Sequence, residues 1–130
     1  MSGTDPPSVL VVEDDPSVRG FITEMLRDDG YRVLEAPSGQ EAVRAVNAPT
    51  THTEPPCLVL LDLMLPGMGG LDVLQELAAP GGRVPVVVMS ASREHLAAAQ
   101  AAGADGVLPK PFEMDQLLGV VEAYCADTPG

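Results

Sequence analysis

The chain has 130 residues, of which 45% are hydrophobic and 20% charged, so its length and composition fit one globular domain and exclude disorder as its main state. Seven basic against nineteen acidic residues give a formal net charge of −12, and the aromatic residues are only two Phe and two Tyr. This charge repels polyphosphate backbones, so nucleic acid is not expected to be a direct partner.

Five short apolar runs alternate along the chain with helical patterns, which is typical of an α/β domain with a parallel sheet. The runs lie at residues 9–12, 31–34, 58–61, 86–89 and 106–108. The first, third and fourth are apolar throughout, as is usual for parallel strands that are covered on both faces. The second and fifth are shorter or more mixed, so we expect them at the edges of the sheet.

The first helix is predicted to begin at the N-cap Asp15, with Pro16 at its first position, and to stop at Gly30. The i, i+3, i+4 spacing predicts one buried stripe along this helix. The members of the stripe are Val18, Phe21, Ile22, Met25 and Leu26.

Four further helical patterns follow. Ser38 and Glu41 form a capping box before the second helix, which carries apolar residues at 42, 43 and 46. A third helix is expected over residues 71–79 and a fourth over residues 93–102. The fourth is rich in alanine, which favours either close packing on the sheet or an adaptable surface, and the pattern leaves both open. The last helix is expected to place on one face Met114, Leu117, Leu118, Val121 and Cys125.

The histidines and cysteines do not form a recognisable site. Residues 47–56 (NAPTTHTEPP) read as a solvated loop that contains His52, and His95 as a surface or capping residue of the fourth helix. Cys57 and Cys125 lie far apart and neither belongs to a CxxC pair, so we expect buried thiols rather than a disulfide.

Polar side chains follow the predicted strands, at the edge where open parallel sheets bind ligands. These residues are Glu13, Asp14 and Asp15 after the first strand, Asp62 after the third, Ser90 after the fourth and Lys110 after the fifth. Asp15 is explained as a helix cap, but the other three carboxylates would repel one another unless a cation joined them. Mg²⁺ prefers oxygen ligands of this kind. The alternative is that these acids only cap helices at a polar edge.

Lys110 is the only lysine among the seven basic residues, and it lies between Pro109 and Pro111. A compact ammonium group suits a single phosphoryl or carboxylate oxygen. Ser90 adds a hydroxyl that can donate to the same anion, although serine is also common at strand ends. Lys110 and Ser90 are therefore candidates to contact an anion at this edge.

Four segments carry these residues: VLVVEDDP (9–16), LVLLDLMLPGMGG (58–70), VPVVVMSAS (84–92) and GADGVLPKPF (103–112). In this order and spacing they resemble the receiver domain of two-component response regulators. The resemblance implies a flavodoxin-like, doubly wound α/β fold, a five-stranded parallel sheet in the order 2-1-3-4-5 flanked by five helices. We expect a disordered N-terminal tail over residues 1–7, the receiver domain over 8–125 and a C-terminal tail over 126–130.

The resemblance also implies roles for the acidic residues. Asp62 would accept a phosphoryl group from a sensor histidine kinase or a phosphotransfer protein. Asp14, Asp62 and the backbone carbonyl of Met64 would bind Mg²⁺, with Glu13 acting through water. The cofactor implied is therefore Mg²⁺.

Ser90 would occupy the switch position and Lys110 would contact the phosphoryl group. The Lys110–Pro111 bond is commonly cis in the family, but the sequence does not fix its isomer. Two positions depart from the family. Val107 stands where Tyr or Phe is usual, so the aromatic rotamer switch cannot operate in its usual form. Gly69 stands where Asp is more usual, which we expect to loosen a turn without affecting the chemistry.

The expected function is a phosphorylation-controlled switch, and not an enzyme beyond assisting its own phosphorylation and dephosphorylation. An aspartate-nucleophile phosphohydrolase would need a second acid two residues after Asp62, where Met64 stands. A degenerate receiver that acts only as a binding module would normally have lost Asp62, one of the acidic pair or Lys110, and all are present.

The sequence contains neither a signal peptide nor an apolar run long enough to cross a membrane, so we expect a cytoplasmic protein without membrane contact. It starts at a methionine and ends just after the last predicted helix, which favours a free-standing domain. We expect a monomer or a weak homodimer. The downstream protein target is not defined by the sequence.

Overall fold

The structure, a computed structural model, describes residues 7–47, 56–65, 67, 69–77 and 84–125. One sheet of five parallel strands has the order β2-β1-β3-β4-β5. The strands are β1 (Ser8–Val12), β2 (Arg32–Ala36), β3 (Leu58–Asp62), β4 (Val86–Ser90) and β5 (Gly106–Pro109). The helices are α1 (Pro16–Asp28), α2 (Gly39–Asn47), α3 (Gly70–Leu77), α4 (Arg93–Ala101) and α5 (Met114–Cys125). The predicted fold class, strand order and edge strands are confirmed.

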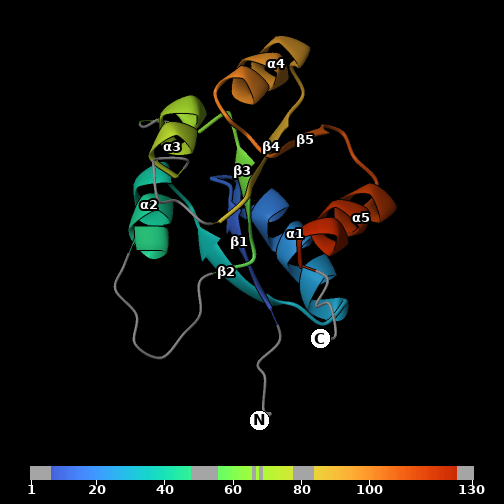
Figure 1. The fold of residues 1–130 in the computed structure, drawn as a ribbon. Helices are drawn as coiled ribbons and strands as arrows, with labels where there is room; N and C mark the ends of the chain where they lie inside the picture. The colour runs from blue at the N-terminus through green and yellow to red at the C-terminus, as the bar shows by residue number, and fades with distance from the viewer. Residues whose placement is uncertain (1–6, 48–55, 66, 68, 78–83, 126–130) are drawn as a thin grey trace.

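The sheet separates two hydrophobic layers, because alternate side chains of each strand point to opposite faces. Val9 and Val11 of β1 pack in the layer formed with α1 and α5. Leu10 and Val12 pack in the layer formed with α2, α3 and α4. Figure 1 shows α1 and α5 together on one side of the sheet and α2 and α3 on the other. Every residue of β3 and β4 is buried, which explains why their apolar runs are continuous.

The first helix follows the prediction at its start but not along its whole stripe. Asp15 caps it, and its side chain accepts N–H groups of the first turn, the shorter bond being 2.8 Å. Phe21, predicted to be buried, is 59% exposed. The buried face is centred on Ile22 and Leu26 and extends to Thr23. Because a helix turns by about 100° per residue, Phe21 lies at the opposite, outer edge of this face.

The structure tests the predicted capping box of α2 and the two alternatives left open for the alanine-rich α4. The Ser38 hydroxyl accepts the N–H of Glu41 at 3.2 Å, as the predicted capping box requires. On α4 only Leu96 and Ala99 are buried, so close packing on the sheet is limited to this narrow stripe and most of the alanines face outward.

The last helix differs from the prediction at both ends. Met114, expected on the apolar face, is exposed at the first turn, whereas Leu117 and Val121 are buried as predicted. Cys125, the last residue of the helix, forms a disulfide with Cys57, so the expectation of two free thiols was wrong. The two cysteines are 68 residues apart in sequence, and only the packing of α5 beside the start of β3 brings them together.

None of the helices in the described ranges has the length and apolar character that crossing a bilayer requires. Several expectations fall outside those ranges. They concern His52 and most of its loop, the end of the third helix, and the two tails at 1–6 and 126–130.

Candidate functional site

The carboxyl ends of the central strands bring polar side chains into an otherwise apolar sheet. Asp62 ends β3 and Ser90 ends β4, while Glu13 directly follows β1. Their exposed fractions are 3%, 1% and 2%, respectively. Asp14, the next residue after Glu13, is exposed. The site therefore has a buried polar floor and one carboxylate open to solvent.

Three carboxylates and one ammonium group form the centre of this site. Glu13, Asp14 and Asp62 each place an oxygen within 4.8 Å of the others. The Lys110 Nζ lies 3.3 Å from Glu13 Oε1 and 3.4 Å from Asp62 Oδ2. Lys110 thus comes from the end of β5 to bridge two of the three acids. The predicted convergence of these four residues is confirmed.

The buried Glu13 carboxyl has an altered proton affinity. Burial raises its pKa from the ordinary 4.5 to about 7, and the hydrogen bond to Asp62 and the charge of Asp62 act in the same direction. The Lys110 ammonium and the backbone N–H of Asp15 lower the pKa, without cancelling the effect of burial. Without a metal, Glu13 is therefore partly protonated near neutral pH.

The donor set fits a hard divalent cation. The site offers carboxylate oxygens from three residues, and among the residues that the structure describes only one ammonium group, that of Lys110, lies within ion-pair distance of Glu13 and Asp62. Mg²⁺ is commonly held by one or two carboxylates together with water and phosphate oxygens. Because Asp14 is exposed, a cation from solvent can reach the carboxylate cluster. These residues could therefore hold Mg²⁺.

Backbone contacts fix the other side chains of the site. The N–H of Met64 donates to Asp62 Oδ1 at 3.0 Å, which leaves Oδ2 facing Lys110. Ser90 accepts the N–H of Ser92 at its hydroxyl oxygen at 3.0 Å, so its own hydroxyl proton remains available to donate. The backbone carbonyl of Ser90 accepts the N–H of Lys110 at 2.9 Å, and the Lys110–Pro111 bond is cis.

One residue of the site was missed by the sequence analysis. The Arg19 guanidinium donates to the backbone carbonyl of Glu13 at 2.8 Å and also forms an ion pair with Glu35 at 3.1 Å. It therefore fastens the turn that carries Glu13 and Asp14 to α1 and β2. Nothing in the sequence distinguished Arg19 from the other arginines on helices.

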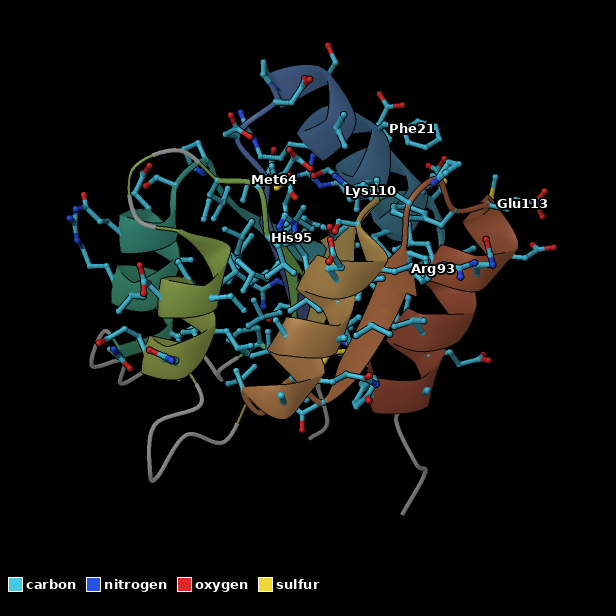
Figure 2. The ribbon with its side chains drawn as sticks, turned by 90° about the horizontal axis from the view of Figure 1, so that it is seen from above. Phe21, Met64, Arg93, His95, Lys110 and Glu113 are labelled. Atoms are coloured by element: carbon cyan, nitrogen blue, oxygen red, sulfur yellow. A yellow bond between two sulfur atoms is a disulfide. The ribbon has the colours of Figure 1, made fainter. Side chains whose placement is uncertain are left out.

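The neighbouring residues singled out by the sequence lie around this centre rather than in it. Val107 is partly buried against the layer that contains α4. His95 is exposed on α4 and lines, with Asp72, a small cavity of about 200 Å³ at the start of α3. Figure 2 looks onto this end of the molecule, with Met64 and Lys110 between Phe21 of α1 and His95 of α4.

The chain is similar to curated response regulators. It is 37% identical over 125 residues to the response regulator MprA of Mycolicibacterium vanbaalenii, a match that covers 95% of this chain and 52% of MprA. It is 39% identical over 117 residues to the DNA-binding response regulator MtrA of Mycolicibacterium smegmatis, covering 88% of this chain and 49% of MtrA. The chain thus spans about half the length of these relatives.

Solved structures of receiver domains have a similar fold. The receiver domain of the Francisella response regulator 1452 has a TM-score of 0.81 at 29% identity, covering 92% of this chain and 97% of that one. That of the sensor histidine kinase PA1611 from Pseudomonas aeruginosa PAO1, with a magnesium ion coordinated in its active-site cleft, has a TM-score of 0.81 at 28% identity and covers 94% and 99%. The family model described as the response regulator receiver domain matches residues 9–122 of the chain. The chain therefore belongs to the receiver domain family of two-component response regulators.

Proposed function

We propose that Asp62 is the phosphoacceptor of this receiver and that its phosphorylation switches the start of α4. The observation that carries the proposal is the position of Asp62 between the acidic cluster and the Lys110 ammonium, 3.4 Å from its Oδ2. Glu13 also lies within reach of Lys110, but its raised pKa leaves it partly protonated near neutral pH. Asp62 is therefore the better nucleophile of the two.

In the proposed reaction a carboxylate oxygen of Asp62 attacks the phosphorus of a phosphohistidine on a sensor histidine kinase or a phosphotransfer protein. The P–N bond breaks, its electron pair stays on the imidazole nitrogen, and an acyl phosphate forms on Asp62. Lys110 changes partner from the carboxylates to a phosphoryl oxygen and stabilises the charge that develops there. The Met64 N–H holds Asp62 in place through its other oxygen.

Asp14, Asp62 and the backbone carbonyl of Met64, with Glu13 through water, would hold Mg²⁺, which when bound supplies positive charge to the phosphoryl oxygens. Deprotonation of Glu13 completes the negative charge that a cation requires. The same residues support Asp62 in its own dephosphorylation, and beyond this the protein acts as a signalling switch rather than as an enzyme.

The readout passes through two consecutive hydrogen bonds at the end of β4. The Ser90 hydroxyl oxygen accepts the N–H of Ser92, and the Ser92 hydroxyl accepts the N–H of His95 and thereby caps α4. A dianionic acyl phosphate attracts the free proton of the Ser90 hydroxyl, so Ser90 turns toward it and the bond to Ser92 changes. The capped end of α4 would then shift. This route does not need an aromatic side chain at Val107.

The partners follow from this role. A histidine kinase or phosphotransfer protein supplies the phosphoryl group, and a downstream protein reads the state of α4. We place the protein in the cytoplasm as a monomer or weak homodimer. The net charge of −12 argues against direct contact of this domain with nucleic acid.

The test is incubation with Mg²⁺ and a small-molecule phosphodonor, followed by intact mass spectrometry. The wild type should gain one phosphate, and Asp62→Asn should gain none. Asp72→Asn removes an exposed aspartate at the first turn of α3 and is the matched control, which should be phosphorylated like the wild type. A phosphate on Asp62→Asn, or phosphorylation of the wild type without a divalent cation, would contradict the proposal.

A further inference from the structure

A second chemically reactive feature lies near the amino ends of the strands, at the opposite end of the sheet from the acidic site. Cys57 directly precedes β3 and Cys125 ends α5, and the disulfide between them spans a Cα–Cα distance of 5.4 Å. Asp62 lies five residues along β3 from Cys57, about 16 Å at the usual rise of a strand. The disulfide therefore has no contact with the chemistry proposed for Asp62.

The disulfide fastens the C-terminal end of α5 to the central strand. Val121 and Cys125 are the buried residues in the second half of this helix. Next to Cys125, the Tyr124 hydroxyl donates to the backbone carbonyl of Asp105 at 3.0 Å. The chain has no other cysteine, so this bond is the one covalent tie available to α5. Without the disulfide, the end of the helix would be held by the packing of Val121 and by the exposed hydrogen bond of Tyr124.

We propose that Cys57 and Cys125 are a thiol–disulfide pair through which low-molecular-weight thiols control how firmly α5 is held on the sheet. Disulfides are rare in cytoplasmic proteins and, where present, are usually transient or redox-sensing. The cytoplasmic location is part of the proposed function, and this inference rests on it in that respect. The accessibility of the pair is consistent with exchange, because Cys57 is partly exposed whereas Cys125 is 5% exposed.

The exchange takes place in two balanced steps. A thiolate attacks the Cys57 sulfur, a mixed disulfide forms there, and Cys125 leaves as a thiolate that takes up a proton. A second thiolate attacks the outer sulfur of the mixed disulfide, which releases a symmetrical small disulfide and the Cys57 thiolate. Two electrons pass from two small thiols to the protein. Oxidation by a small disulfide reverses both steps and restores the tie.

The expected consequence is local. Reduction frees the C-terminal end of α5, while β3 stays buried between two layers on both of its faces. Lys110 lies at the other end of α5, separated from its first residue by three residues. We therefore expect the redox state to change the local opening of α5 and to leave phosphorylation of Asp62 nearly unchanged.

The experiment equilibrates the folded protein with glutathione buffers of increasing reduced fraction, blocks free thiols with an alkylating agent and counts adducts by intact mass. The expected result is a reversible transition from no adduct to two adducts without denaturant. Hydrogen–deuterium exchange of both states should show amides of α5 exchanging at least about tenfold faster after reduction, with β3 unchanged.

Two variants separate the redox effect from simple loosening. Cys57→Ser should show fast exchange in α5 whatever the buffer, and chemical reduction of the wild type gives the same comparison if this variant folds poorly. Tyr124→Phe removes the neighbouring hydrogen bond but should keep the redox response. Phosphorylation of both redox states is measured in parallel. Failure of phosphorylation in both would contradict the role of Asp62 without affecting the adduct count.

Three outcomes would overturn the inference. One is that the disulfide resists millimolar thiols until the protein is denatured, since the bond would then be purely structural. Another is that both thiols stay free under oxidising conditions. The third is that α5 exchanges at the same rate in both redox states, because the bond would then not control the helix.

Discussion

Glu13 offers the most direct test of the electrostatics at the acidic site, through the substitution Glu13→Gln in buffer freed of divalent cations by a chelator. The Glu13 side chain is almost fully buried and burial is the main cause of its raised pKa, from 4.5 to about 7. Glutamine has nearly the same shape and stays neutral at every pH. The substitution therefore imitates the protonated form of Glu13.

The sign of the effect follows from proton binding. Between pH 4.5 and about 7 the folded chain holds a proton on Glu13 that the unfolded chain has lost, so the stabilisation present below pH 4.5 is lost as the pH rises through the folded pKa. At about 1.36 kcal/mol for each pH unit, the loss amounts to about 3 kcal/mol. The free energy of unfolding of Glu13→Gln, minus that of the wild type, should rise from near zero at pH 4.5 to about 3 kcal/mol above neutrality.

Urea unfolding at several pH values across this range measures the difference. Glu94→Gln, which removes an exposed carboxylate on α4, is the matched control and should differ from the wild type by less than about 0.5 kcal/mol throughout. A difference between Glu13→Gln and the wild type that does not change with pH would refute the argument from burial.

Three further results are expected. Gly70→Ala should destabilise the protein by about 2 kcal/mol or more in urea unfolding, because a Cβ at this position would overlap the backbone just after β3. Gly119→Ala on α5 has open space around the added Cβ, so it should be neutral or stabilising by up to ~1 kcal/mol. Equal effects of the two substitutions would contradict this reasoning. Lys110→Ala should keep or strengthen Mg²⁺ binding measured by calorimetry while disabling phosphoryl transfer or its readout, and weaker Mg²⁺ binding would count against the role of the lysine. A beryllium fluoride mimic should move amide NMR signals near Ser90 more than those near Val107, and the opposite order, unaffected by Ser90→Ala, would disprove the proposed readout.

The fold could be predicted because several independent signals agree. Continuous apolar runs mark β3 and β4 as covered on both faces, and weaker runs mark the two edges. The position of the acidic site could be predicted because Glu13, Asp62 and Lys110 each follow a strand, and the carboxyl ends of parallel strands lie together. Their residue types then led to the hypothesis of a cation and a phosphoryl group at this site.

The errors about which helix residues are buried have a common physical origin. Phe21 and Met114 fit the spacing of a buried stripe, but spacing does not fix how far around the helix the covering elements extend. The burial of Thr23 shows that the sheet covers α1 further toward one side than the apolar residues suggest. Arg19 was missed because its contact is with a backbone carbonyl, and such a contact leaves no pattern of residue types.

The disulfide was missed because it depends on where two separate elements, β3 and α5, lie relative to each other. Cys57 is placed by the start of β3 and Cys125 by the end of α5, and neither helix nor strand pattern relates these ends. Their proximity follows only after α5 is laid back across the sheet on the same face as α1. A prediction would have needed the length and direction of α5 as well as the strand order.

The topology that assembles the acidic site also separates it from the disulfide. In a parallel sheet all carboxyl ends lie at one edge, where Asp62 and Lys110 meet, and all amino ends lie at the other, where β3 begins beside Cys57. α5 begins at Met114, four residues after Lys110, and ends at Cys125, so it spans the distance between these two ends of the sheet. The proposed phosphorylation of Asp62 and the proposed thiol exchange therefore take place at opposite ends of the strands, the first acting on α4 and the second on α5. Because the two chemistries share no side chain, Asp62→Asn and Cys57→Ser should remove one response each and leave the other in place.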